Sequence, residues 1–198
     1  MMTFLDILLS FVIGILTGFL SWKIVTKVFV PQIEISDFIS KSLDPTNKQT
    51  KYRIKIVNTG RRPAFEFNII AEIRFKQKDP TSNGNTQIMR IGINTVPLAY
   101  LGIQKGRTMN LKTELIPKEH RRHLPEEFQE RLGKNERIPL EEIFDVLGED
   151  SRIRVYIMCS DGVSGNRKYF VSKDLSKSDI TNDKFHPNGV GKLSGGPV

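Results

Sequence analysis

Paired cationic residues are the groups in this sequence best suited to chemistry. Six of them lie in or beside segments that we expect to be turns, where binding groups usually lie. Arg and Lys side chains that converge can bind the phosphates of a nucleotide or of a single nucleic-acid strand. The candidate phosphate ligands are Arg61, Arg62, Arg121, Arg122, Arg167 and Lys168.

These cations also allow two other interpretations. Positive charge close to a cytoplasmic leaflet attracts anionic lipid by about 1 kcal/mol per residue, and a merely solvated basic surface is the plainest alternative. Five glutamates near His120 argue against a continuous nucleic-acid stripe in that region: Glu119, Glu126, Glu127, Glu130 and Glu136. Four tyrosines are candidate stacking partners for bases, although we expect most of them to pack in the core: Tyr52, Tyr100, Tyr156 and Tyr169.

Patterns typical of catalysis or metal binding are missing from the sequence. His120 and His123 are close along the chain, but no Cys or carboxylate pair completes a zinc set. No nucleophile elbow, phosphate-binding loop, dinucleotide fingerprint or HExxH motif occurs. Cys159 ends the alternating face of a predicted strand, which favours a small buried apolar residue over a nucleophile. We therefore expect no catalytic residue, no metal and no cofactor, and a protein that is not an enzyme.

The composition is that of a folded basic domain with an unusual beginning. The chain has 198 residues, with 30 Lys and Arg against 22 Asp and Glu, and a formal charge of +8. A hydrophobic share of 38% excludes wholesale disorder. The single cysteine excludes an internal disulfide and favours a reducing compartment. The first 22 residues contain no Lys or Arg and one acid, Asp6.

Residues 4–22 form an apolar stretch that predicts a membrane-spanning helix. Nineteen residues at 1.5 Å each give about 28 Å, close to the hydrocarbon thickness of a bilayer. A cleavable signal peptide would have a basic start, a shorter apolar run and small residues at a cleavage site, so we predict a retained anchor. Lys23 and Lys27 follow Trp22 and favour a cytoplasmic C-terminal domain on a single-pass inner-membrane protein. A periplasmic domain on an inverted anchor is the alternative.

One side of the predicted span is small and polar. At 100° per residue, six residues fall within an arc of about 80° around the helix: Thr3, Asp6, Ser10, Gly14, Thr17 and Ser21. Gly14 and Gly18 add a GxxxG spacing, which lets helix backbones approach closely. The pattern predicts a homo-oligomer in which a ring of helices turns its small polar arc toward a central axis, and the alternative is a simple helix pair or no association. The candidate pore or interface residues are Asp6, Ser10, Gly14, Thr17, Gly18 and Ser21.

After Pro31 the apolar residues recur with period two, which is typical of half-buried strands. In residues 51–58, Tyr52 and Ile54 share one face while Arg53 and Lys55 share the other. In residues 63–75, the odd-numbered side chains from Phe65 to Phe75 are expected on a single face. We predict strands at 32–38, 51–58, 63–75, 87–93, 96–101, 108–115, 151–159 and 166–171, short helices at 125–132 and 139–147, and a flexible loop at 79–85.

The predicted fold class is therefore mainly β. Many short strands with turn residues between them favour an antiparallel immunoglobulin-like β-sandwich over residues 31–180. A small barrel is the alternative. Residues 1–30 would form the transmembrane helix and its juxtamembrane segment, and residues 181–198 a flexible C-terminal tail.

The outline of one short N-terminal span followed by a β-domain resembles the small membrane effectors of bacterial nucleotide-signalled antiphage defence systems. In that group a soluble domain senses a nucleotide or oligonucleotide, and oligomerised helices then perturb the inner membrane. The resemblance covers the whole chain as architecture, and no motif transfers a residue role. A bitopic envelope scaffold with an immunoglobulin-like domain has the same outline.

Two functions follow from these observations. The first is a homo-oligomeric, single-pass membrane protein that forms or gates an ion-conducting pore under the control of an anionic nucleotide or oligonucleotide. The second is a non-enzymatic anchored β-sandwich that recruits a protein partner. The small polar arc distinguishes them, because a pore needs small residues there and a recruiter tolerates Leu.

Overall fold

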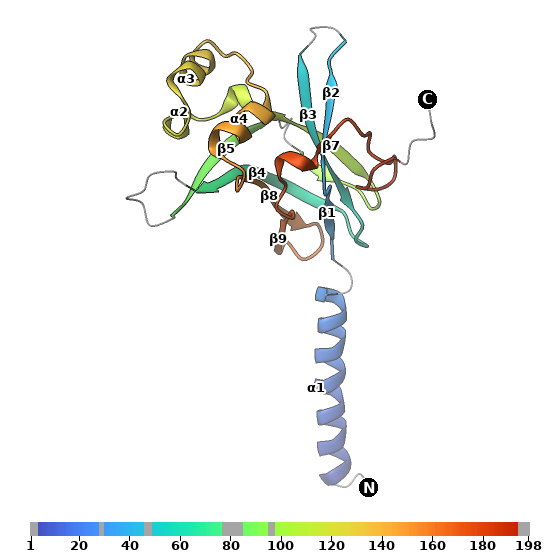
Figure 1. The fold of residues 1–198 in the computed structure, drawn as a ribbon. Helices are drawn as coiled ribbons and strands as arrows, with labels where there is room; N and C mark the ends of the chain where they lie inside the picture. Colours follow the sequence, from blue (N-terminus) through green and yellow to red (C-terminus); the bar gives the residue numbers. More distant parts are fainter. Residues whose placement is uncertain (1–3, 28–29, 46–48, 77–84, 95–97, 194–198) are drawn as a thin grey trace.

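The computed structural model describes residues 4–27, 30–45, 49–76, 85–94 and 98–193. An N-terminal helix, α1 (Phe4–Lys27), stands apart from a β-rich domain (Figure 1). Its stretch Asp6–Val25 is long and apolar enough to cross a membrane, and none of it is buried by the rest of the chain. The predicted apolar helix is confirmed. By length and composition it could be a membrane span or a signal sequence.

The β-domain is a curled, mostly antiparallel sheet that forms a half-barrel. Its central path runs β10-β2-β3-β7-β5-β4-β8-β9, with β1 paired to β3 and β6 to β4. The prediction of a mainly β, antiparallel domain is confirmed, and the described strands are joined in one hydrogen-bonded path where an immunoglobulin sandwich has two separate sheets. The strands are β1 (Ile33–Ile35), β2 (Ile39–Leu43), β3 (Thr50–Asn58), β4 (Ala64–Lys76), β5 (Thr86–Asn94), β6 (Tyr100–Leu101), β7 (Gly106–Lys112), β8 (Arg152–Asp161), β9 (Arg167–Val171) and β10 (Ile180–Thr181).

The curl of the sheet comes from β5, which pairs with two different strands along its length. Its first part, through Ile91, pairs with β4, and its last part, from Gly92, pairs with β7. A Cβ atom at Gly92 would lie 2.2 Å from the Cβ of Leu115, so the chain needs glycine where β5 changes partner. One strand therefore links the two halves of the sheet.

Short helices cover one end of this sheet. The two predicted helices are confirmed as α3 (Glu126–Gly133) and α4 (Leu140–Leu147), each preceded by a proline, which suits a helix start. Apolar residues of α4 join the strand residues in one core cluster. The sequence did not predict β2, β10, α2 (Lys118–Arg121), or the two 3-10 turns η1 (Thr113–Leu115) and η2 (Lys177–Asp179).

The prediction that the odd-numbered side chains of β4 share a single face is wrong at the beginning of the strand. A bulge between Phe65 and Asn68 shifts the register against β8, and Glu66 takes a positive φ of 52°. Ala64 is therefore buried while Phe65 lies half-exposed against Tyr100, with ring centres 5.0 Å apart. Beyond the bulge the expected alternation returns, and Ala71, Ile73 and Phe75 are buried.

The chain after β10 packs on the sheet through Leu193. Phe185 lies against Phe38, with ring centres 4.8 Å apart, and bridges to Lys192. We expected this segment to fray, but its aromatic ring covers part of the core. Parts of two sequence predictions, the loop at 79–85 and the strand at 96–101, lie outside the described residues.

Candidate ligand-binding face

The six predicted phosphate ligands do not come together in one site. Arg61 and Arg62 lie in the turn between β3 and β4, while Arg167 and Lys168 begin β9. These two segments meet at one end of the sheet, since Ala64 pairs with Asp161 at the end of β8. Arg121 and Arg122 belong to or follow α2, which lies beside β5 on the other side of the domain, away from α1 (Figure 1). Whether any of them binds phosphate stays a prediction.

The end of the sheet that carries Arg61, Arg62, Arg167 and Lys168 is also the end next to α1. Gln32, five residues after the helix, accepts a hydrogen bond from Thr59 N at 2.8 Å. Asn58 O accepts one from Gln104 N at 2.7 Å, which brings in the turn between β6 and β7. We call the segments 30–32, 58–62, 102–105 and 161–167 the helix-proximal end.

Arg62 forms an ion pair within the domain at this end. Its Nη1 lies 3.2 Å from Oδ2 of Asp161, whose side chain is only 1% exposed. Burial alone would raise the pKa of Asp161, but hydrogen bonds from Ser164 and Val163 and the charge of Arg62 hold it below its ordinary value. Arg121 similarly donates from Nε to the carbonyl of Ile116 at 2.9 Å. Both arginines therefore have structural roles.

A different group of residues has the geometry of a binding surface. On the outer face of β4, β8 and β9, residue pairing aligns Ile70 with Tyr156 and Met158 with Tyr169. The rings of Tyr156 and Tyr169 stack with centres 5.9 Å apart and planes 25° from parallel. Tyr169 is 59% exposed, so one flat aromatic surface is open to solvent. We call Asn68, Ile70, Tyr156, Met158 and Tyr169 the tyrosine face.

Arginine side chains lie at both ends of the tyrosine face. The guanidinium carbon of Arg74 lies 5.6 Å from the centre of the Tyr156 ring, and its Nη2 donates to the Tyr156 hydroxyl. At the other end Arg167 is exposed and precedes Tyr169 by two residues. A shallow pocket of about 350 Å³ lies over this face, bounded also by Glu72. Its volume is within the range of small-molecule sites.

Two of the arginines near this pocket form ion pairs with neighbouring carboxylates. Arg154 donates from Nε to Oδ1 of Asp174 at 2.6 Å. The hydrogen bond from Arg154 lowers the pKa of Asp174, and the same bond raises the pKa of Arg154. Glu72 lies 3.7 Å from Nε of Arg90. Arg74 and Arg167 are therefore the cations best placed for an anion on the tyrosine face.

This arrangement suits a planar anionic ligand. A base stacked on an exposed aromatic ring gains about 1–3 kcal/mol and needs no sequence-specific hydrogen bond. Phosphates attached to such a base can reach an arginine at the edge of the face. Comparison of the sequence with known protein families and with curated proteins finds no match.

Sequence reasoning missed most of this face because it expected tyrosines to pack in the core. That expectation is confirmed for Tyr52, which is buried, and is wrong for Tyr100 and Tyr169. A usable signal was present in β8, where Tyr156 and Met158 alternate with the buried Val155, Ile157 and Cys159. Cys159 is buried as predicted, and burial raises the pKa of its thiol to about 11.

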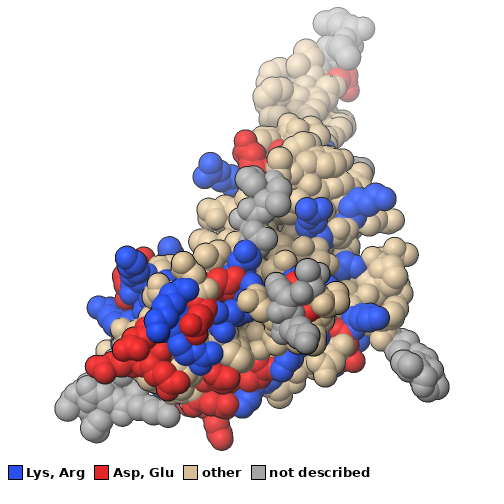
Figure 2. Space-filling view, turned by 90° about the horizontal axis from the view of Figure 1, so that it is seen from above, with Lys and Arg blue, Asp and Glu red and all other residues tan. Residues whose placement is uncertain are grey.

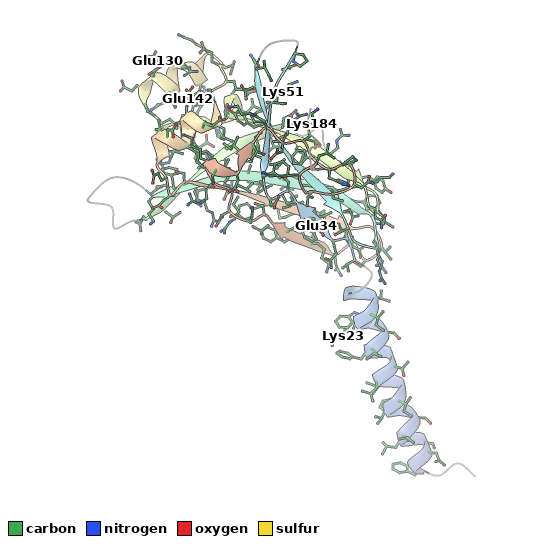
Figure 3. The ribbon with its side chains drawn as sticks, turned by 45° about the vertical axis from the view of Figure 1, so that its right-hand side comes forward. Lys23, Glu34, Lys51, Glu130, Glu142 and Lys184 are labelled. Atoms are coloured by element: carbon green, nitrogen blue, oxygen red, sulfur yellow. The ribbon has the colours of Figure 1, made fainter. Side chains whose placement is uncertain are left out.

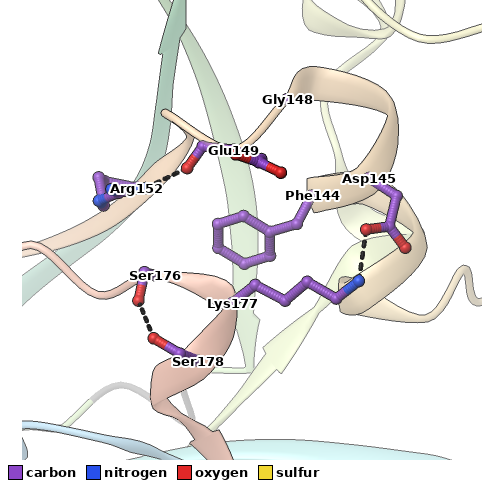
Figure 4. Close-up of a pocket in the computed structure, with 8 residues that line it drawn as sticks. All are labelled: Phe144, Asp145, Gly148, Glu149, Arg152, Ser176, Lys177 and Ser178. Carbon is purple, nitrogen blue, oxygen red and sulfur yellow. Dashed lines mark hydrogen bonds and ion pairs between the residues drawn. The ribbon is translucent and has the colours of Figure 1, made fainter.

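A larger pocket of about 630 Å³ lies between α4 and η2, but several of its polar groups are already partnered (Figure 4). Lys177 pairs with Asp145, and Arg152 donates to the carbonyl of Glu149 at 2.5 Å. The hydroxyls of Ser176 and Ser178 hydrogen-bond to each other at 2.7 Å. The larger pocket therefore offers a ligand fewer available groups than the tyrosine face.

Two further observations limit the chemistry of the described residues. Among them, no cluster of three or more His, Cys, Asp or Glu side chains could hold a metal ion. Acidic and basic side chains are intermixed on the side of the domain seen in Figure 2, opposite α1. That side lacks the continuous basic stripe on which a nucleic-acid strand would lie.

Proposed function

We propose that this chain is a single-pass membrane protein of the inner membrane whose helices associate to form or gate an ion-conducting pore. An anionic nucleotide or oligonucleotide, held on the tyrosine face of the cytoplasmic domain, controls it. The observation that carries the proposal is the position of α1, which is apolar over Asp6–Val25 and buries none of that stretch against the domain. A helix of this kind needs lipid or other copies of itself to cover it.

Small residues on α1 support association between copies. Cβ atoms built at Gly14 or Gly18 would meet nothing within 4 Å, so a second helix can approach there. Ser10 and Thr17 donate their hydroxyls to carbonyls of their own helix, Asp6 O and Ile13 O, each at 2.8 Å. These hydroxyls need no partner outside the helix. The support therefore comes from the small size of these residues more than from their polarity.

Control by a nucleotide is supported by the tyrosine face and by the chain outline. Stacking on Tyr169 and charge from Arg167 and Arg74 suit the two parts of a nucleotide, its base and its phosphate. The outline resembles membrane effectors of nucleotide-signalled antiphage systems, so antiviral defence is the proposed context. Lys23 and Lys27, just after the span, support the cytoplasmic orientation.

The test is nucleotide binding by the full chain in detergent, measured with a set of mono- and oligonucleotides. We expect Tyr169→Ala and Arg167→Glu each to weaken binding by roughly 10-fold, because one stacked base or one charged contact is removed. Tyr100→Ala is the matched control, since Tyr100 is equally exposed but lies against Phe65 outside the tyrosine face. Affinity for an oligonucleotide should also fall steeply with salt.

Two outcomes would change the proposal. If the chain is oligomeric and conducts ions but binds no nucleotide, control by a nucleotide is contradicted and the proposed pore stands. A monomeric chain that does not conduct would favour the alternative function, a non-enzymatic anchored β-domain whose exposed tyrosine face recruits a protein partner.

A further inference from the structure

We infer that the helix-proximal end of the β-domain docks on the surface of the bilayer that α1 spans. In this arrangement Val163 and Ile103 enter the headgroup region and nearby cations contact anionic lipid. The inference rests on the membrane span in the proposed function and is independent of the pore and of the nucleotide.

The short connection between α1 and the sheet keeps this end near the membrane. Val30 follows Lys27 by three residues, so their Cα atoms are at most about 11 Å apart. The juxtamembrane segment is also fixed to the domain, because Gln32 bonds with Thr59 and Asn58. Figure 1 shows the end of β3 and the β8–β9 hairpin on the side of the domain toward α1. The domain therefore meets the membrane with this end.

Two turns at this end carry an exposed aliphatic side chain at the tip. Val163, in the β8–β9 turn, is 69% exposed, and Ile103, in the β6–β7 turn, is 48% exposed. The Val163 turn is held in shape by Asp161, whose carboxylate accepts hydrogen bonds from Val163 N at 3.3 Å and from the Ser164 hydroxyl at 2.5 Å. Turns usually carry polar residues because they face water. Aliphatic tips on shaped turns suit insertion between lipid headgroups.

The charges around the two tips complement an anionic leaflet. Lys105 and Arg107 follow Ile103 and are exposed, as are Arg61 and Arg167 in the neighbouring segments. The exposed acids in this region are Glu34 on β1 and Glu66 in the β4 bulge, and Glu66 accepts a hydrogen bond from Ser160 at 2.9 Å. Cations therefore outnumber acids around the tips.

The opposite side of the domain carries exposed acids among its cations. Figure 3 shows Glu130, Glu142 and Lys51 far from α1, and Glu34 on the part of the domain nearest to it. Glu126 and Glu127 are exposed on the same helix as Glu130. An anionic surface thus attracts the helix-proximal end more strongly than the mixed α3 side, which favours one orientation of the domain.

The test uses the full chain in nanodiscs, with Cys159→Ala to leave no other thiol. An environment-sensitive dye is attached at Val163→Cys or Ile103→Cys, and each sample is compared in discs rich in phosphatidylserine and in discs of phosphatidylcholine alone. We expect a blue shift and protection from an aqueous quencher at both sites in the anionic discs. Leu43→Cys is the control, because Leu43 is also exposed, at the far end of β2, and its dye should not change. The double variant Lys105→Glu, Arg107→Glu should lose most of the shift.

The outcomes separate docking from the span itself. A chain that does not enter the discs would overturn the membrane span. A chain that enters them while both dyes stay in water would overturn docking and leave the span intact. A shift that persists in detergent and grows with protein concentration would mean that a second copy covers the tips, which also contradicts lipid docking.

Discussion

The ammonium group of Lys55 donates hydrogen bonds to the backbone carbonyls of His186, at 2.5 Å, and Pro187, at 2.7 Å. The two partners lie 131 and 132 residues further along the chain. Lys55 is only 6% exposed, and burial lowers its pKa. The C-terminal segment therefore closes over a buried cation in the middle of the sheet.

Removing residues 184–198 should destabilise the domain, because Lys55 would lose both carbonyl partners. We expect a loss of about 2–3 kcal/mol in the free energy of unfolding, the usual cost of leaving a charged group without its hydrogen bonds. Urea unfolding of the full and shortened chains in detergent measures it. In the shortened chain, Lys55→Met should recover part of the lost free energy of unfolding, because it removes the buried charge. Equal stability of the two chains would show that the segment is not needed. The control Lys177→Met, which breaks an exposed ion pair, should cost less than about 0.5 kcal/mol.

Asp161 should make stability depend on pH at the acidic end. Its folded pKa lies below the ordinary 3.8, so its contribution is complete above pH 3.8 and is lost as the pH falls through the folded value. We expect Asp161→Asn to cost about 3 kcal/mol at neutral pH, since Arg62 would keep a buried charge without its partner. The difference from the parent should shrink as the pH falls below 3.8. Thermal unfolding across this range measures it, and a difference that stays constant with pH would contradict the assignment. The exposed Asp145→Asn is the control.

Gly162 and Phe65 should behave as a coupled pair. A Cβ atom at position 162 would lie 2.3 Å from Cε2 of Phe65, so Gly162→Ala must displace the ring. We expect a loss of about 1–3 kcal/mol, as for other overpacked sites. Phe65→Ala should remove most of that cost in the double variant. A double-mutant cycle in urea measures the coupling, and strictly additive losses would rule out the contact as the cause.

The small face of α1 should control assembly. Gly14→Leu places a large side chain where a second helix would approach, so we expect it to dissolve the oligomer and abolish conductance in planar bilayers. Leu9→Ala, on the opposite side, is the control and should have little effect. Asp6→Asn should weaken cation preference without stopping assembly, because it removes one charge in the first turn of α1. A Gly14→Leu chain that assembles and conducts like the parent would show that this face does not line the contact.

The sequence predicts the strands well where one face is continuously apolar. The alternation from Tyr52 to Ile56 and from Ile153 to Cys159 repeats every two residues, so β3 and β8 could be placed almost to their ends. The short strand β2 was missed because Ser40, Lys41 and Ser42 interrupt its apolar pattern. The bulge at Glu66 has no local signal, since its positive φ occurs at a residue that rarely adopts one.

The candidate site was harder to predict because it depends on which turns meet in space. Arg61 and Arg167 lie at the same end of the sheet, but only the pairing of β4 with β8 brings them there. The partner that buries Lys55 is more than a hundred residues away and gives no local pattern. For Tyr169 the strand assignment was right, and the error was to expect a tyrosine in the core.

The described sheet ends at β9 on one side and at β10 on the other, so the half-barrel keeps open edges. Edge strands on neighbouring molecules tend to pair, and in the membrane protein that we propose, copies would meet at high local concentration. Two cations, Arg167 and Lys168, begin β9 and would repel the same strand of another copy. Crowding in the plane of that membrane would therefore bring the domains together without edge-to-edge pairing of their sheets. Contacts between the helices would then form and separate reversibly.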